Sequence, residues 1–404
     1  MPYTLMRHLR RAALVTQQIR VESTMTNLTQ KDFLFRPPLA HWTKVIKEAE
    51  KIVGYPTSFM NLRWLLSDEF ANLAMHLRKV VDSNHPIIKT ARSIIYNEQN
   101  TLQPWGLVIL LLSKAFNPSN TTLLASQVTE NQRILAELTE MIRTGHYVHC
   151  GLLNVPVEER EQNMDTSMFA NKIAVLIGDY LLVTANSMLA RLKNQDLSYL
   201  ISTALRDISE GEFFGDRDAQ NMPIPGKPVM NDSDEFQISS DTLPLDVRNT
   251  LGSPIREWTL RTMYNGGSLF GRGCQGALLL SGQTLEEQEK AYLFGCHLCL
   301  TWQAASELQN FTSQKKESYS LVSAPVLFAL NDNPELYSVI EEARNNLNDI
   351  DLEKFRMDVV KTDAIERTKL LYIENAKKVY NYIEILSESE SEVISTIKSL
   401  VKTL

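Results

Sequence analysis

The sequence predicts an all-α protein with one large helical domain. Apolar residues recur at three- and four-residue steps through most of the 404 residues, which is the period of an amphipathic helix. No segment shows a convincing two-residue alternation, and no β-α-β rhythm appears. The hydrophobic fraction of 44% is ample for a sizeable core. We therefore expect one domain over residues 36–404, preceded by a segment of different character.

The first 30 residues have the composition of a targeting segment. They hold no acidic residue before Glu22, and their arginines are Arg7, Arg10, Arg11 and Arg20. A basic, acid-poor start is typical of a mitochondrial transit peptide, whereas a secretory signal needs a continuous apolar core that Arg10 and Arg11 would interrupt. A plain basic tail is the alternative. We expect residues 1–30 to direct the chain to the mitochondrial matrix.

Charge and cysteine content exclude several classes of protein. The formal net charge is −7, and no Lys/Arg block longer than two residues occurs beyond the first dozen, so nucleic acid is not expected as a partner. No apolar run approaches the ~20 residues of a membrane-spanning helix, so we expect no transmembrane segment. The cysteines are too few and too unevenly spaced for a disulfide framework. They are Cys150, Cys274, Cys296 and Cys299.

Helix signals follow one another through the first half of the chain. Residues 40–54 place apolar side chains on one face and end at Gly54. Thr129, with Gln132 three residues later, forms a capping-box start for a long helix that Pro156 closes. The other helices expected here cover residues 62–81, 87–96, 106–116 and 168–192, with one more beginning near Leu197.

Between Gly211 and Pro254 the composition changes to Asp, Asn, Gly, Ser and Pro. Such a stretch cannot bury enough apolar area to order itself, so we expect a mobile surface insertion at about 211–254.

Helical spacing returns after the insertion. Thr284 with Glu287 marks a second capping-box start, for a helix that runs to about Phe311. The other helices expected in this half cover residues 258–280, a segment after Pro334, 352–360 and 363–386, and Ser387–Glu392 is expected to be a solvated turn.

Two short motifs are better explained by packing than by chemistry. Gly271, Gly273 and Gly276 match the dinucleotide fingerprint G-x-G-x-x-G, but that site needs a preceding strand and a helix that begins at the glycines. Here the glycines fall inside a helical pattern, which favours close helix packing. Cys296 and Cys299 have C-x-x-C spacing, but no second ligand pair accompanies them, so we expect buried helix cysteines.

His146 and His149 lie one helical turn apart and could share a metal ion. No acidic residue neighbours them and no H-E-x-x-H pattern is present, so packing is the preferred interpretation. No nucleophile-elbow motif announces a hydrolase either.

Four segments resemble the all-trans prenyl diphosphate synthase family, and they occur in the family's order. Residues 136–154, ending HCGLLN, are similar to the helix that carries the family's first motif, H-D-D-x-x-D. Residues 171–182, NKIAVLIGDYLL, and 265–277, NGGSLFGRGCQGA, resemble two further family segments. Residues 294–310 resemble the second aspartate-rich helix, F-Q-x-x-D-D-x-x-D. The resemblance runs from about Leu39 to the C-terminus and implies an isoprenoid synthase-like helical bundle with a central apolar cavity.

The resemblance also shows which of the family's residues this chain lacks. In the family both aspartate-rich motifs hold Mg²⁺, which binds the allylic diphosphate while it ionises. The residues at the first motif are Cys150, Gly151 and Asn154, and those at the second are Ser306, Glu307 and Asn310. One carboxylate of six remains. We therefore expect no catalytic residue and no metal ligand in this chain.

The family's phosphate-binding cations are missing as well. The G-K-x-x-R-P segment corresponds to residues 100–106, where neither Lys nor Arg occurs. Glu158 and Glu159 lie where the family has R-R-G, and Asn265 and Gly266 replace its Lys-Thr pair. A diphosphate needs Arg, Lys or a metal ion to hold its charge.

These losses predict a supporting role within a complex. The resemblance is strongest to the non-catalytic subunits of heteromeric synthases that make the ubiquinone side chain. It implies a catalytic partner subunit that binds Mg²⁺, and a heterotetramer. By the resemblance, Gly145 lies at a position that controls product length in the family. Without a metal ion in this subunit, we do not extend that role to Gly145.

Two alternatives remain open. One is a divergent prenyltransferase that builds a metal site from Asp179, Glu307, Asn154 and Asn310. The other is a protein that binds a polyprenyl lipid without reacting it.

Overall fold

The computed structural model describes residues 39–54, 104–116, 128–152, 164–229, 236–313, 319–386 and 392–402. Within these ranges every regular element is a helix, and the only strand-like pairing is an isolated bridge between Arg217 and Pro223. The predicted all-α class is confirmed. The expected transit peptide, the helices at 62–81 and 87–96, and the turn after Leu386 lie outside the described residues, as does Asn154.

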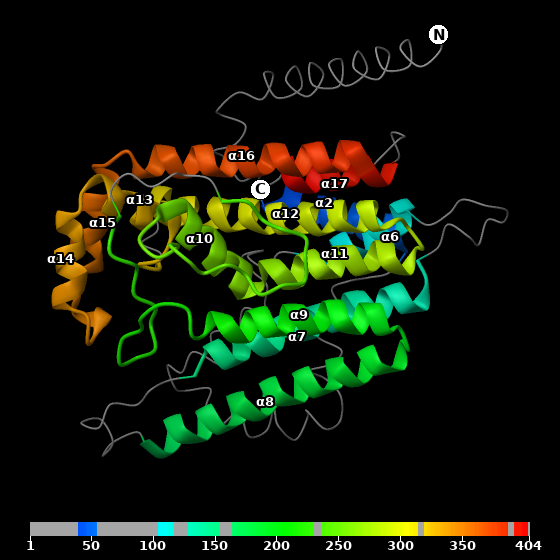
Figure 1. Cartoon of the computed structure of the whole chain (residues 1–404), viewed down its shortest axis with the longest axis horizontal. Coiled ribbons are helices and arrows are strands. Elements are labelled where there is room, and N and C mark those ends of the chain that lie inside the picture. The colour runs from blue at the N-terminus through cyan, green and yellow to red at the C-terminus, as the bar shows by residue number, and fades with distance from the viewer. Residues whose placement is uncertain are drawn as a thin grey trace, which may run out of the picture.

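Six long or central helices lie side by side along the long axis of the molecule (Figure 1). In order across the bundle, α16 packs on α12, α12 on α11, α11 on both α9 and α7, and α7 on α8. Their bounds are α7 Glu130–Cys150, α8 Met164–Arg191, α9 Gln195–Gly211, α11 Ser268–Leu280, α12 Leu285–Thr312 and α16 Ala364–Leu386.

Smaller helices complete the two ends of the bundle. Near one end α6 (Trp105–Phe116), α2 (Leu39–Val53) and α17 (Glu392–Lys402) contact one another. At the other end lie α10 Pro254–Thr262, α13 Ala324–Asp332, α14 Glu335–Glu342, a 3₁₀ turn at Leu347–Asp349 and α15 Leu352–Val360 (Figure 1). Helix α8 lies at one edge of the described bundle, and none of the other described helices covers its far side (Figure 1).

The helix starts follow the predicted capping chemistry. The Thr129 hydroxyl accepts from the Gln132 backbone N–H, and the Gln132 side chain accepts from the Thr129 N–H. Thr284 and Glu287 make the same reciprocal pair at the start of α12. Each box satisfies two backbone donors that a helix N-terminus otherwise leaves unpaired, so the starts of both helices could be located from sequence.

The predicted helix at 258–280 is interrupted. A π-helical segment, η2 (Met263–Gly267), separates α10 from α11, and Gly266 within it has φ 127°. A Cβ at Gly266 would lie 2.6 Å from Cη2 of Trp105, so the indole ring packs directly on the backbone there. Continuous helical periodicity was therefore a wrong prediction, because only glycine accepts both this dihedral angle and this close approach.

The glycine and cysteine motifs are packing features, as predicted. A Cβ at Gly271 would lie 2.6 Å from Sγ of Cys296, so α11 and α12 approach closely at this point. Cys274, Cys296 and Cys299 are all buried free thiols within these two helices. Neither motif forms a binding loop.

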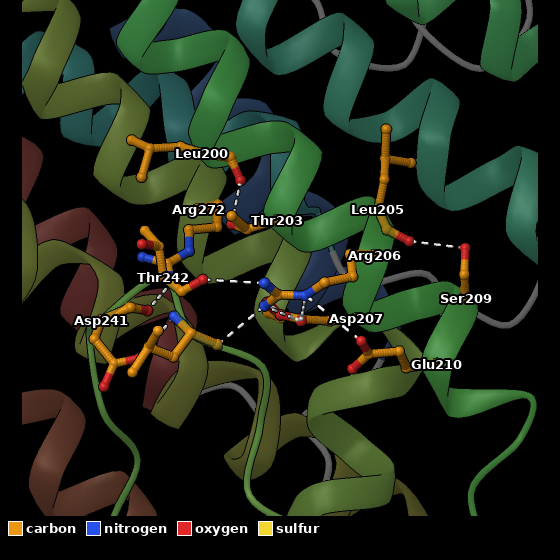
Figure 2. A network of polar contacts seen from close by, with 12 residues as sticks. Leu200, Thr203, Leu205, Arg206, Asp207, Ser209, Glu210, Asp241, Thr242 and Arg272 are labelled. Atoms are coloured by element: carbon orange, nitrogen blue, oxygen red, sulfur yellow. Dashed lines mark hydrogen bonds and ion pairs between the residues drawn. The ribbon is translucent and has the colours of Figure 1, made fainter.

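The predicted insertion has no helix between Glu212 and Ser253 where it is described. Part of it is nevertheless anchored to the bundle (Figure 2). Arg206 of α9 donates to the backbone carbonyls of Thr242 and Leu243, both at 3.0 Å, and to Asp207 at 2.7 Å. Arg272 of α11 donates to the carbonyls of Ser240 and Asp241. One arginine of α9 and one of α11 thus hold residues 240–243 against the bundle. Mobility of the rest of the insertion stays a prediction.

Candidate functional site

The first motif lies where α7 ends. Cys150 is the last helical residue, and Gly151 caps the helix by donating its N–H to the Val148 carbonyl at 3.2 Å. The third motif residue, Asn154, is not among the described residues. The described part of the predicted first motif therefore presents a thiol and a glycine backbone.

Three side chains from different parts of the chain meet at Cys150. Its Sγ lies 3.7 Å from Nδ1 and 3.6 Å from Nε2 of His146, one turn back on α7. It also lies 3.9 Å from Oε1 of Glu212, which directly follows α9. A second contact holds the His146 ring, because its Nε2 is 3.1 Å from Oδ1 of Asn265. We name His146, Cys150 and Glu212 the α7 corner.

The contact of His146 with Asn265 brings together two positions that the resemblance treats separately. By that resemblance, Cys150 corresponds to the first motif and Asn265 to the family's lysine. Glu212 was not singled out from the sequence, because it lies 62 residues beyond Cys150 and no local spacing connects them. Among the described residues, these three side chains are the one group of His, Cys and acidic residues placed closely enough to share an ion.

Burial favours the uncharged forms of two groups in the α7 corner, the Cys150 thiol and the His146 imidazole. Although Cys150 is exposed as a residue, its sulfur faces His146 and Glu212, and desolvation together with the Glu212 charge raises the thiol pKa to about 12. Desolvation also lowers the pKa of His146, partly opposed by the Asn265 hydrogen bond. A protonated thiol beside a neutral imidazole is not an activated nucleophile.

His149 belongs to a different contact. Its Nε2 lies 3.3 Å from the Val175 carbonyl and 3.4 Å from the Asp179 carboxylate, both on α8. Its ring lies against Gly178, where a Cβ would come within 2.1 Å of Nε2. His146 and His149 therefore face different elements, and His149 packs α7 onto α8. Gly145 likewise faces α8, 3.2 Å from the Gly178 carbonyl when measured from an added Cβ.

The second motif is integrated into the protein core. Glu307 is 8% exposed; its Oε2 accepts from Nε1 of Trp258 and from the Ala324 backbone N–H, each at 2.8 Å. Its Oε1 accepts from Gln303 at 2.7 Å. Desolvation raises the pKa of Glu307 to about 7, against these three hydrogen bonds, which lower it. The one retained carboxylate thus joins α12 to α10 and α13.

The other two residues of the second motif carry no charge. Ser306 and Asn310 are half-buried, and the Asn310 backbone carbonyl accepts from Arg356. The residues of the two motifs therefore do not fit Mg²⁺, which requires several oxygen ligands with little tolerance in geometry.

The segment at the start of α6 is also occupied by the protein itself. The backbone N–H of Gly106 donates to Oε1 of Glu140 at 2.8 Å. Arg143, on the same face of α7, pairs with Glu140 at 3.5 Å and lies over the Trp105 ring at 4.2 Å. A helix N-terminus is a natural anion site, and here an internal carboxylate fills it.

Aromatic rings fill the interior behind these sites. Trp105 stacks on Phe270 with ring centroids 5.0 Å apart, and Phe270 stacks on Trp302 at 5.7 Å. All three are at most 2% exposed, and they come from α6, α11 and α12.

Comparison with known proteins identifies the family. Residues 104–354 match the model of the polyprenyl synthetase family. The chain belongs to that family. It is 37% identical to human all trans-polyprenyl-diphosphate synthase PDSS2 over 298 residues, which cover 71% of this chain and 68% of the human protein. It is 27% identical over 409 residues to a probable mitochondrial hexaprenyl pyrophosphate synthase of Neurospora crassa, covering 90% of this chain and 84% of that one.

Solved structures agree on the fold. Heptaprenyl diphosphate synthase of Staphylococcus aureus superposes with a TM-score of 0.56 at 17% identity, covering 91% of this chain and 98% of that chain. The apo form of an Arabidopsis medium/long-chain prenyl pyrophosphate synthase gives 0.51 at 22% identity, covering 83% and 94%. At these identities the likeness concerns the fold of this polyprenyl synthetase family member, and it bears out the predicted isoprenoid synthase-like bundle.

A cavity of about 1630 Å³ lies away from both motifs. It is bordered by residues 236–250 of the insertion and by α10, α12, α13 and α16. Its rim carries both signs of charge, including Arg256, Lys377, Lys378 and Glu374. None of the described motif residues lines it, so it is separate from the place where family members carry their aspartates.

The outer side of α8 exposes several large apolar side chains in this polyprenyl synthetase chain, beside polar ones such as Lys172 and Asp179. Five large side chains there are at least 38% exposed: Met168, Val175, Leu176, Tyr180 and Val183. By length and composition Met168–Arg191 could also cross a membrane, but 44% of its most apolar window is buried inside the protein. Since its inner side packs along α7, we interpret α8 as a core helix with one uncovered side.

Proposed function

We propose that this chain is the non-catalytic, required subunit of a heteromeric trans-polyprenyl diphosphate synthase that makes the isoprenoid side chain of ubiquinone. A catalytic partner subunit with intact aspartate-rich motifs would bind Mg²⁺ and carry out the chain elongation. Family membership and the 37% identity to human PDSS2 support this placement. The mitochondrial names of relatives from Neurospora and rice, together with the basic first 30 residues, support a location in the mitochondrial matrix.

The observation that carries the proposal is that the Glu307 carboxylate accepts hydrogen bonds from inside the protein. A metal-binding carboxylate in this family must face the substrate, yet the Glu307 oxygens accept from Trp258, Ala324 and Gln303. Withdrawing the carboxylate to bind Mg²⁺ would leave the buried indole and backbone donors without partners, at about 1–3 kcal/mol each. The remaining acid of the second motif is thus committed to packing.

The site at the start of α6 argues in the same direction. Glu140 already fills the anion position at the Gly106 N–H, and its charge would repel a diphosphate. The α7 corner offers one carboxylate, Glu212, which is also paired with Arg217 at 3.3 Å. Among the described residues, neither of these two places has the cations or the paired acids that ionisation of an allylic diphosphate requires.

The uncovered side of α8 supports association with a partner. Apolar side chains that gather on one side of an outer helix mark an interaction surface when their extent exceeds the usual scatter. Symmetric pairing of related subunits through such a face would produce a dimer-like contact, and two contacts of this kind give the heterotetramer that the resemblance implies.

The test is reconstitution. The full chain is expressed alone, the catalytic homologue from the same source alone, and the two together, and each preparation is assayed with allylic and isopentenyl diphosphates at saturating Mg²⁺. We expect product from the co-expressed pair, co-purification of the two chains, and no product from this chain alone.

Two results would contradict the proposal. Full activity of the homologue alone, with no complex, would remove the need for this subunit. Product formed by this chain alone would favour the divergent-enzyme alternative, although Asp179 pairs with His149 on α8 while Glu307 is buried on α12.

A further inference from the structure

We propose that the α7 corner is a Zn²⁺ site formed by His146, Cys150 and Glu212. It occupies the position of the first aspartate-rich motif but has a different ligand chemistry. This departs from the expectation of no metal ligand in the chain, and it does not depend on the proposed subunit function.

The separations between the three ligand atoms fit a tetrahedral ion. Zinc binds cysteine sulfur at about 2.3 Å and histidine nitrogen at about 2.0–2.1 Å, so in a tetrahedral site the two atoms lie roughly 3.5 Å apart. The Sγ of Cys150 is 3.7 Å from Nδ1 of His146 and 3.9 Å from Oε1 of Glu212. The sulfur is also 3.6 Å from Nε2, so the His146 ring has to turn for Nδ1 to point at the ion.

A second layer of contacts sets the protonation of the ligands. The Asn265 amide oxygen only accepts hydrogen bonds, so Nε2 of His146 carries the proton and Nδ1 keeps the lone pair that would bind the ion. A ligating histidine whose other nitrogen donates to an oxygen is the usual arrangement in zinc sites. Arg217 pairs with Oε2 of Glu212 at 3.3 Å, which leaves Oε1 for the ion.

Charge and ligand type select zinc over magnesium. A thiolate, a carboxylate and a neutral imidazole together balance the two charges of Zn²⁺, and Cys150 would release its proton to solvent on binding. Mg²⁺ prefers six oxygen ligands, of which this corner supplies one side chain. Sulfur and imidazole are ligands that favour zinc. One position of the tetrahedron remains for water or another group.

A bound ion would join three elements. Cys150 and His146 end α7, Glu212 begins the insertion after α9, and Asn265 lies in the π-helical segment η2. The site would therefore fix Glu212, near the start of the insertion, to the end of α7, 28 residues ahead of the anchor at residues 240–243. A bound ion would thereby stabilise the fold.

The test uses metal binding by the full chain. After chelation and dialysis, the protein is loaded with Zn²⁺ for metal analysis and with Co²⁺ for absorption spectroscopy. We expect about one ion per chain, a thiolate-to-Co²⁺ charge-transfer band, and the intense visible bands of tetrahedral coordination. Zinc should also raise the midpoint of thermal unfolding, and excess Mg²⁺ should not displace it.

Variants assign the ligands. Cys150→Ser should abolish the charge-transfer band, and His146→Gln and Glu212→Gln should each weaken binding at least tenfold. Asn265→Ala, which removes the contact that orients the ring, should weaken it about 10–100-fold. The controls are His149→Gln, one turn away on α7, and Glu210→Gln, two residues before Glu212; both should bind like the parent, and circular dichroism checks that each variant is folded.

Three results would overturn the proposal. They are a zinc content far below one per chain, a Co²⁺ spectrum without the charge-transfer band, and a band that persists in Cys150→Ser. The first two are measured on the unmodified chain, so they hold even where a variant fails to fold.

Discussion

Glu307, which the resemblance assigns to the second motif, has a packing role in the folded protein. Desolvation raises its pKa from an ordinary value of 4.5 to about 7, while its three hydrogen bonds act in the opposite direction. Between pH 4.5 and 7 the folded protein keeps a proton that the unfolded chain has lost. Unfolding therefore releases a proton in this window, and the free energy of unfolding should fall as pH rises through it.

Glu307→Gln tests this titration. The amide cannot ionise, so the variant should lose less stability than the parent between pH 5 and pH 7.5. Near pH 5 we expect the variant to be less stable than the parent. The difference in pH response is of the order of 3 kcal/mol at most, from about 1.4 kcal/mol per pKa unit. Urea unfolding at several pH values measures it, with exposed Glu342→Gln as the control. Parallel pH profiles for the parent and Glu307→Gln would show that Glu307 does not titrate in this range.

At the scale of helices, capping boxes predicted where two helices begin, but the sequence did not predict where a helix is interrupted. Thr129 and Thr284 begin helices because a capping box needs only residues three apart, which a sequence displays directly. The break at Met263–Gly267 depends on Trp105, some 160 positions earlier, packing onto Gly266. Helical periodicity carries no information about such a distant contact.

Gly178 is the residue of α8 on which the His149 ring of α7 packs. An added Cβ would lie 2.1 Å from Nε2 of His149, so Gly178→Ala should displace the ring and lose its contact with the Val175 carbonyl. We expect a loss of about 1–3 kcal/mol in the free energy of unfolding, the usual cost of overpacking. Denaturant unfolding measures it, and exposed Ser187→Ala on the same helix serves as the control.

A double variant separates sterics from helix propensity. If the ring is the obstacle, Gly178→Ala should cost little in a His149→Ala background, because the space is then free. An equal cost in both backgrounds would contradict the proposed close packing of His149 on Gly178.

For the whole molecule, the sequence suggested which residues correspond to the family's motifs but not what those residues contact. The assignment of Cys150, Gly151, Ser306, Glu307 and Asn310 to the two motifs rests on the order of the family segments and stays a prediction. Sequence could not indicate that Glu307 accepts from Trp258, that Glu140 fills the start of α6, or that Glu212 meets Cys150. Each of these contacts joins residues between 34 and 62 positions apart, so only the folded bundle brings them together.

The uncovered side of α8 gives the last prediction, which concerns assembly. Leu176 and Val183 are 52% and 68% exposed on an outer helix. Replacing both with Glu places two charges where an apolar partner surface would have to desolvate them, so recovery of the catalytic homologue with this chain should fall at least tenfold. The fold should persist, since neither side chain is buried. Met357→Glu on α15, 65% exposed, is the matched control. Undiminished recovery with the double variant, measured by co-purification, would place the interface on another face of the bundle.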